Sequence, residues 1–211
     1  MIKSILGAVC CMSLLAINPL NADSSMADEL KGASSGTVSS RFRGGYSFGI
    51  GYQGRMGGEG DTKIQGLLFE GGVYGLINPI QNFLDIEVGL SGKYNTGMST
   101  SSNDSSETKY YAGLKQVTIY GGTVFRFGKS KKAIAIGVSK ALYIDEVQSD
   151  DLKEAGIKKH DLENGVGAYI EYQSGDSDIF FVRAEVEQID VVSELETSQD
   201  TIGSILVGMK F

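Results

Sequence analysis

The sequence predicts an all-β fold: a transmembrane antiparallel up-and-down β-barrel of about eight strands, preceded by a cleaved signal peptide. Three observations predict it. An apolar leader opens the chain, segments of alternating apolar and polar residues fill most of the remainder, and the connections between those segments alternate between short and long. Glycine accounts for 29 of 211 residues and proline for only 2, which is typical of crowded strands and not of a disordered chain.

The leader has the three parts of a signal peptide. Lys3 is its only charge, residues 5–17 form an apolar core, and Asn18-Pro19 break that core just before the small residue Ala22. A transmembrane helix is the alternative, but the apolar part is shorter than the ~20 residues that a bilayer requires. We therefore expect a signal peptide at 1–22, a polar periplasmic leader at 23–40 and the barrel at 41–211.

Composition narrows the functions that remain. Both cysteines, Cys10 and Cys11, lie in the leader, so the exported chain is expected to contain no disulfide. The chain has 19 Lys and Arg, of which Lys3 leaves with the signal peptide, against 26 Asp and Glu. Because nucleic-acid binding needs a basic face that displaces counterions, this acidic balance argues against a nucleic-acid partner.

Eight segments show the period of two that a half-buried strand requires. In the first of them, Phe48, Ile50 and Tyr52 share one face, and small or polar residues occupy the other. The expected strands are 42–53, 65–76, 83–94, 110–127, 133–143, 162–172, 180–187 and 203–211.

Connection lengths separate a membrane barrel from a soluble β-sandwich, which shows the same alternation. Three links are short, at 78–82, 129–132 and 174–177, and Asn78-Pro79 is expected to form the first tight turn. Three links are long and polar, at 95–109, 144–161 and 190–200. Short periplasmic turns and long extracellular loops are the pattern of outer-membrane barrels.

Aromatic residues are expected to form two girdles, one at each membrane interface. Those at the short-turn ends are Phe42, Phe83, Phe125, Phe127, Tyr172, Phe180 and Phe211. Those at the long-loop ends are Tyr52, Tyr94, Tyr110, Tyr111 and Tyr143. Aromatic residues scattered through a soluble core are the alternative.

These features, together with the alternating last strand 203–211, resemble the small eight-stranded bacterial outer-membrane β-barrel superfamily. Its members include the membrane domain of outer-membrane protein A, the X-type proteins and the opacity-like proteins. The resemblance implies localisation in the outer membrane, contact with outer-membrane lipid and delivery by the barrel-assembly machinery. In that superfamily the machinery recognises an alternating last strand with a terminal aromatic residue, which Met209 and Phe211 match here.

No pattern in the sequence indicates catalysis or a cofactor. Residues 49–54 fit the spacing G-x-G-x-x-G, but a glycine-rich stretch follows them instead of the helix that would hold a pyrophosphate. His160 is the only histidine, and it lies in a loop beside lysines, whereas the lipid-modifying enzymes of the superfamily carry a histidine on the barrel wall. Asp150, Asp151, Glu154 and His160 match no metal-ligand motif. We therefore expect no enzyme activity, cofactor or metal.

Charged residues on the inward face are the candidate functional site. The expected lumen charge network is Glu70, Asp85, Glu87, Lys93, Arg126, Glu171, Arg183, Glu185, Glu187 and Lys210, and Arg43 shares that face. Counting strand steps from the short turns places Arg183 among Glu87 and Glu185. Because charges in a narrow lumen are costly unless paired or hydrated, an ion-paired plug and a merely polar lumen are both open.

Two functions follow as alternatives. The first is a structural barrel whose long acidic loops meet host or other surface ligands. The second is a narrow, porin-like channel for small solutes or ions. An eight-stranded barrel has an interior that side chains can fill, so the structural role is favoured.

Overall fold

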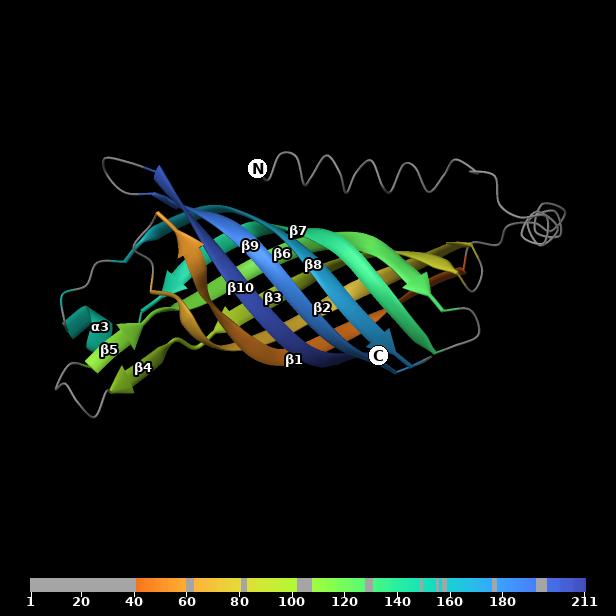
Figure 1. Cartoon of the computed structure of the whole chain (residues 1–211), viewed down its shortest axis with the longest axis horizontal. Coiled ribbons are helices and arrows are strands. Elements are labelled where there is room, and N and C mark those ends of the chain that lie inside the picture. The colour runs from red at the N-terminus through yellow and green to blue at the C-terminus, as the bar shows by residue number, and fades with distance from the viewer. Residues whose placement is uncertain are drawn as a thin grey trace, which may run out of the picture. The chain divides into compact units, whose positions relative to one another are not determined.

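Eight antiparallel strands close into a barrel, as the sequence predicts. The computed structural model describes residues 41–59, 63–80, 83–101, 108–127, 131–148, 150–154, 156, 159–175, 178–192 and 197–211. The strands follow the order β1-β10-β9-β8-β7-β6-β3-β2 and tilt around the barrel (Figure 1). Their bounds are Arg41–Gly58 (β1), Gln65–Ile80 (β2), Leu84–Asn95 (β3), Gly113–Arg126 (β6), Lys132–Val147 (β7), Asp161–Ser174 (β8), Ile179–Val192 (β9) and Thr197–Lys210 (β10).

The barrel closes where the first strand meets the last. β1 pairs with β10 from Ser47↔Lys210 to Gly58↔Asp200, and the register shifts once between Arg55 and Gly57. Beyond Lys210, Phe211 exchanges two backbone hydrogen bonds with Tyr46, at 2.8 and 3.1 Å. Closure pairs both sides of each barrel strand, as a membrane-spanning sheet requires.

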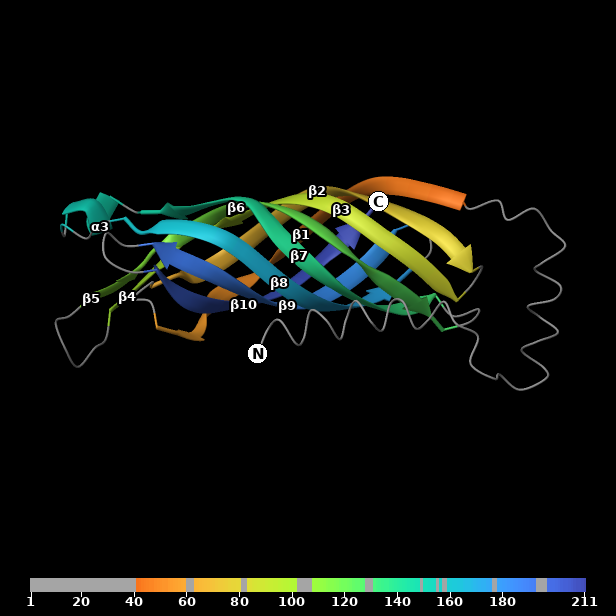
Figure 2. The ribbon, with the colours of Figure 1, turned by 90° about the horizontal axis from the view of Figure 1, so that it is seen from above.

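Two small elements stand at the long-loop end of the barrel. Met98–Ser101 (β4) and Thr108–Tyr111 (β5) form a two-stranded ribbon beyond the β3–β6 hairpin. The helix α3, Asp150–Glu154, lies in the β7–β8 connection. Both views place the ribbon and α3 at the same end of the barrel (Figures 1 and 2). In the described part of the chain, no helix has the length and apolar character needed to span a membrane.

The outer wall of the barrel is apolar. Alternate residues of each strand point outward and leave large side chains exposed, such as Ile50, Val88 and Ile119, which are 47%, 48% and 49% exposed. Exposed aromatic side chains lie at both ends of this wall. Phe83 and Phe180 are near the short turns, and Tyr52, Tyr94 and Tyr143 are near the loops. A continuous exposed apolar wall between two rings of aromatic residues is the surface that a lipid bilayer covers.

The strands extend further beyond this apolar wall than the sequence pattern predicts. The expected long loop at 190–200 is wrong, because β9 continues to Val192 and β10 begins at Thr197. The outer faces of these extensions are polar. Gln199 accepts a hydrogen bond from Gln188 at 2.6 Å and donates one to Asp190 at 3.0 Å. With 14 residues each, β9 and β10 exceed the ~9–11 residues that a tilted strand needs to span a bilayer, so their ends project into water.

Three local expectations are also corrected. Asn78-Pro79 do not form the turn; they lie in β2 where the register shifts between Ile77 and Ile80, because proline lacks the N–H that regular pairing needs. The expected strand 110–127 is divided between β5 and β6 at Ala112. Tyr110 and Tyr111 consequently belong to the β4–β5 ribbon, outside the loop-side girdle.

The strands of the barrel lie between Arg41 and Lys210. One compact unit covers Phe42–Phe211. The signal peptide expected at 1–22 and the leader expected at 23–40 lie outside the described residues.

Candidate functional site

The interior of the barrel contains all ten predicted lumen charges. Nine of them are at most 4% exposed, and the side chain of Arg126 is 14% exposed. Arg43, expected on the same face, lies near the start of β1 and is exposed. Alternation along the strands therefore places ionisable groups inside, where only pairing offsets the loss of water.

Two cations and three carboxylates form the central cluster of the lumen. Arg183 donates from Nε to Glu171 at 2.8 Å and from Nη1 to Glu70 at 2.8 Å. The Nζ of Lys210 contacts Glu87 at 2.5 Å and Glu171 at 2.6 Å. Glu171 thus joins both cations, and the cluster connects β2, β3, β8, β9 and β10 across the lumen.

Aromatic rings surround the guanidinium of Arg183. Its Cζ lies 5.0 Å from the ring centroids of Tyr120 and Tyr169 and 5.3 Å from that of Phe181. The two tyrosine rings meet edge to face, with centroids 6.1 Å apart. Cation–π attraction and the rigid rings therefore hold the guanidinium in place between its carboxylate partners.

Two further pairs lie above and below the central cluster. On the loop side, Lys93 binds Glu185 at 2.6 Å, and Ser139 donates to the same carboxylate at 2.6 Å. Near the short turns, Arg126 pairs with Asp85, which also accepts a hydrogen bond from Asn78 at 2.5 Å. These contacts extend the ion pairing along the barrel axis.

Glu187 differs from the other lumen carboxylates, because among the described residues no cation contacts it directly. Gln116 donates to its Oε1 at 2.6 Å, and its Oε2 has no hydrogen-bond partner within the described part of the chain. The interior therefore carries more carboxylates than cations.

The predicted partners of Arg183 were wrong. Its partners are Glu70 and Glu171, whereas Glu87 binds Lys210 and Glu185 binds Lys93. The prediction counted residues from the short turns and assumed that residues the same number of steps from a turn lie at the same height in the barrel. Strands in a closed barrel are staggered by its shear, so residues at equal counts lie at different heights.

A cluster of buried apolar side chains lies inside the barrel on the loop side of the central charge cluster. It consists of buried side chains from β6, β8, β9 and β10 with the bridge residue Ile64, and Ile144 of β7 packs against it. The members are Ile64, Leu114, Leu162, Ile189, Val191 and Ile202. Around this level the outer faces carry the polar residues Gln188, Asp190 and Gln199, whereas apolar side chains cover the outside of the spanning part. The buried polar residues Asn95, Glu146 and Asp200 lie beside the cluster inside the barrel.

Sequence reasoning missed the neutral residues of the lumen. Gln116, Ser139 and Gln173 each hydrogen-bond a lumen carboxylate, and Tyr120 and Tyr169 flank Arg183. All five occupy inward positions of the alternation, so the signal was present. The predicted lumen network included only the charged residues of that face.

Glycines make room for the two lumen tyrosines. A Cβ on Gly89 would lie 2.3 Å from Cζ of Tyr120, and a Cβ on Gly137 would lie 2.5 Å from Cζ of Tyr169. At Gly71, on the outer face, a Cβ would meet nothing within 4 Å. The absence of side chains at inner glycines therefore sets the positions of the rings.

Gly89→Ala is expected to destabilise the barrel by about 1–3 kcal/mol, because the Tyr120 ring must leave its place beside Arg183. The free energy of unfolding in urea, read from heat-modifiable migration on gels, measures this. Gly71→Ala is the matched control and should change the free energy by less than about 0.5 kcal/mol. Equal effects of the two variants would contradict the packing described here.

The remaining predicted site residues lie outside the lumen. Met209 and Phe211 face outward at the end of β10 and are 40% and 55% exposed. The backbone N–H and Nδ1 of His160 lie 2.7 and 2.8 Å from Oε2 of Glu146. Across the described residues, no group of three or more His, Cys, Asp and Glu side chains is placed to hold a metal ion.

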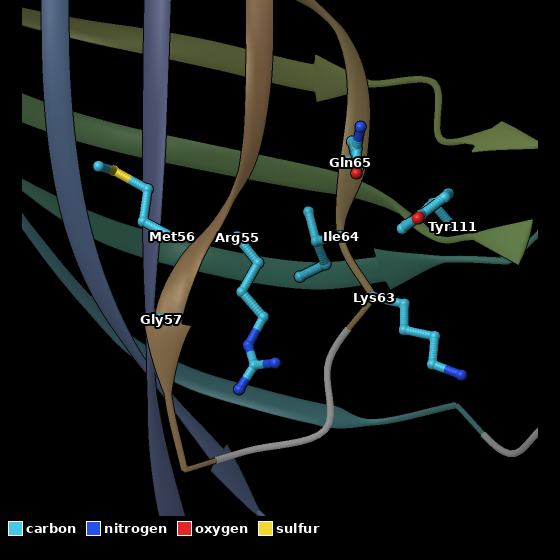
Figure 3. A pocket seen from close by; sticks show the side chains of 7 residues that line it. All are labelled: Arg55, Met56, Gly57, Lys63, Ile64, Gln65 and Tyr111. Atoms are coloured by element: carbon cyan, nitrogen blue, oxygen red, sulfur yellow. The ribbon is translucent and has the colours of Figure 1, made fainter. Parts of the chain in front are cut away.

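A shallow basic pocket of about 280 Å³ lies at the loop-side rim between β1, β2 and β5 (Figure 3). Arg55 and Lys63 supply its charge, and Tyr111 stands on its far side from Arg55. Arg55 donates to Asp200 at 3.2 Å and to the carbonyl of Gly58 at 2.9 Å. Ile64, a buried member of the apolar cluster, also lines the pocket.

No family model and no curated protein matches the sequence. Three solved structures of outer-membrane proteins are similar in fold. OprG from Pseudomonas aeruginosa shares 10% identity over 81% of this chain and 94% of its own, with a TM-score of 0.42. AlkL in lipid bilayers shares 9% identity over 91% and 93%, with a TM-score of 0.42. Ail of Yersinia pestis, solved with the heparin analogue sucrose octasulfate, shares 15% over 80% and 97%, with a TM-score of 0.35.

The fold is that of a small outer-membrane β-barrel. Its own surface carries this conclusion: a closed antiparallel barrel whose exposed wall is apolar and whose interior is charged is built for a bilayer.

Proposed function

We propose that this protein is a structural outer-membrane barrel that displays its loop-side rim at the cell surface and conducts little through its lumen. The observation that carries the proposal is the double closure of the interior. Ion pairs occupy the spanning part, and buried side chains, including the apolar cluster around Ile189 and Ile202, pack inside the projecting end. An ion passing through would have to break buried ion pairs and displace buried side chains at the projecting end.

The rim has the character of an interaction surface. The segments 95–109, 144–161 and 190–200 together contain 12 Asp and Glu and 4 Lys. The β4–β5 ribbon and α3 raise parts of these segments beyond the barrel (Figure 1). An acidic rim favours partners with cationic surfaces and disfavours polyanions, except at the basic pocket beside Arg55 and Lys63.

Epitope insertion at Gly156 tests surface display. Gly156 is exposed next to α3, and a Cβ there would meet nothing within 4 Å. An epitope at Gly156 should be accessible to antibody on intact cells. The same epitope at Gly175, in the short β8–β9 connection, should become accessible only after the outer membrane is permeabilised. The reverse pattern would overturn the proposed orientation.

The narrow channel is the second candidate, and planar bilayers distinguish the two. The purified wild-type barrel should show rare and brief openings, far below the steady current of an open porin measured in the same apparatus. Steady, large conductance from the wild-type protein would replace the structural role with the channel.

A further inference from the structure

Lys140 is out of place on the outer wall of the barrel. Charged side chains on the outer faces of the described strands lie near the strand ends, but Lys140 points outward from the middle of β7. Its cross-strand neighbours on that face are Ile119 and Val166. Along β7 the outward neighbours are Val138 and Leu142, and Leu142 is 61% exposed. A lysine surrounded by lipid-facing apolar residues is unfavourable unless its ammonium reaches the interface.

The interface on the loop side lies within reach of the Lys140 side chain. Tyr143, 52% exposed, marks it three residues further along β7. At ~3.3 Å per residue along a tilted strand, the backbone of Lys140 lies about 8 Å below that tyrosine. Long lysine side chains extend in this way from apolar surroundings to the headgroup region.

Other cations stand at the same interface. Lys115 is exposed on β6, and its cross-strand neighbours are Tyr94 on β3 and Asp145 on β7. Lys159 forms an ion pair with Asp145, and this hydrogen bond raises the pKa of Lys159, which keeps it cationic. Lys115, Lys140 and Lys159 therefore place three cations at or near this part of the wall, although the chain as a whole is acidic.

We propose that the outer wall of β6 and β7 binds a phosphate of an anionic lipid headgroup in the leaflet on the loop side, with Lys115 and Lys140 as its ligands. Charge complementarity identifies the occupant. The backbone of Lys140 lies among acyl chains, so lipids are its neighbours, and its ammonium extends to the headgroup level, where a lipid phosphate supplies an anion. The inference rests on the orientation proposed above, which places this wall in the outer leaflet.

Lipid retention in native mass spectrometry tests the site. The exported chain is reconstituted in zwitterionic phosphatidylcholine with a small fraction of diphosphorylated lipid A, extracted gently and examined for bound lipid. Lys115→Gln and Lys140→Gln should each weaken retention of lipid A about fivefold, and the double variant about 25-fold. Lys153→Gln on α3 makes the same change in net charge away from the wall and should leave retention unchanged.

Three results would overturn the proposal. Retention by the double variant equal to that of the wild type excludes the two lysines as ligands. An equal loss in Lys153→Gln shows an effect of net charge alone. Inorganic phosphate that displaces lipid A at millimolar concentration shows a free-anion site in place of a lipid site.

A charge-retaining variant guards against misfolding. Lys140→Arg should retain lipid A, and heat-modifiable migration verifies that each variant is folded. If Lys140→Gln does not fold, loss of retention in Lys115→Gln with full retention in Lys140→Arg still supports the site, and unchanged retention in Lys115→Gln contradicts it. Epitope accessibility at Gly156 is measured on the same variants, so failure of the proposed orientation is distinguished from failure of the lipid site.

Discussion

Arg183→Ala is expected to destabilise the barrel by about 3–5 kcal/mol, the cost of breaking a buried ion pair from one side. Arg183 is 2% exposed and supplies the hydrogen bond at 2.8 Å to Oε1 of Glu70, whose Oε2 has no hydrogen-bond partner among the described residues. Without Arg183, Glu70 is a buried carboxylate with no cation in contact. Glu171 keeps Lys210 at 2.6 Å, so Glu70 bears most of the loss.

A double-mutant cycle identifies the partner. Glu70→Gln removes the charge that Arg183 neutralises, so the double variant should cost less than the sum of the single changes by about 1–3 kcal/mol. Glu87→Gln, whose partner is Lys210, should show weaker coupling to Arg183→Ala. The chain contains no tryptophan, so the folded fraction in urea is read from migration on gels. Additive costs for Arg183 and Glu70 would contradict the pairing.

Arg126→Ala provides a control of the same residue type at the barrel end. Its side chain is 14% exposed and pairs with Asp85, so water replaces part of the lost interaction and the cost should be about 1 kcal/mol. Arg183→Ala should also increase the frequency of channel openings in planar bilayers, whereas Arg126→Ala should not. Equal destabilisation by Arg183→Ala and Arg126→Ala would contradict a larger contribution of the central cluster to stability.

Deletion of Phe211 is the second change with a large expected effect: the amount of barrel in the outer membrane should fall several-fold. The terminal residue exchanges two backbone hydrogen bonds with Tyr46 at the closing seam, and its ring is 55% exposed toward lipid. The deletion also removes the terminal aromatic residue by which the last strand resembles an assembly signal. Fractionation of cells followed by quantitative immunoblotting measures the outcome.

Two substitutions test whether assembly depends on the backbone hydrogen bonds of Phe211 or on its aromatic ring. Phe211→Ala keeps both backbone hydrogen bonds and removes the ring, so a loss like that of the deletion indicates recognition of the aromatic side chain. Phe127→Ala changes a ring with 50% exposure just beyond β6 and should leave assembly nearly unchanged. Normal amounts of the deleted form would contradict a role for Phe211 in assembly.

The sequence sufficed to predict the barrel because alternation is a local property. Ile205 and Val207 face out and Leu206 faces in for the same reason that the last strand reads as alternating, and each strand repeats this. The ends of β9 and β10 were not predictable from apolar alternation, since their outward residues Gln188, Asp190 and Gln199 are polar while Ile189 and Val191 remain inside. The sequence prediction recognised a strand by its apolar outward residues. Segments with polar outward residues were therefore predicted to be a loop.

Burial of the lumen charges was predictable, but their pairing was not. The inward position of Arg183 follows from its own strand, and its contact with Glu171 follows from the β8–β9 hairpin, where the two residues are paired. Its contact with Glu70 joins β9 to β2 across the lumen and depends on the shear of the closed barrel. Shear depends on the registers of all eight strands together, which no single segment reveals.

A nitroxide scan along β9 and β10 tests the central claim most directly, because it measures which side chains meet lipid and which meet water. Labels at Val182, Val186, Ile205 and Val207 should be accessible to oxygen dissolved in the bilayer, and a label at Leu206 should be protected from both oxygen and a water-soluble nickel reagent. At Gln188 and Asp190 the accessibility should switch from lipid to water. Uniform water accessibility along both strands, or access of the nickel reagent to Leu206, would contradict a sealed barrel with a lipid-facing wall.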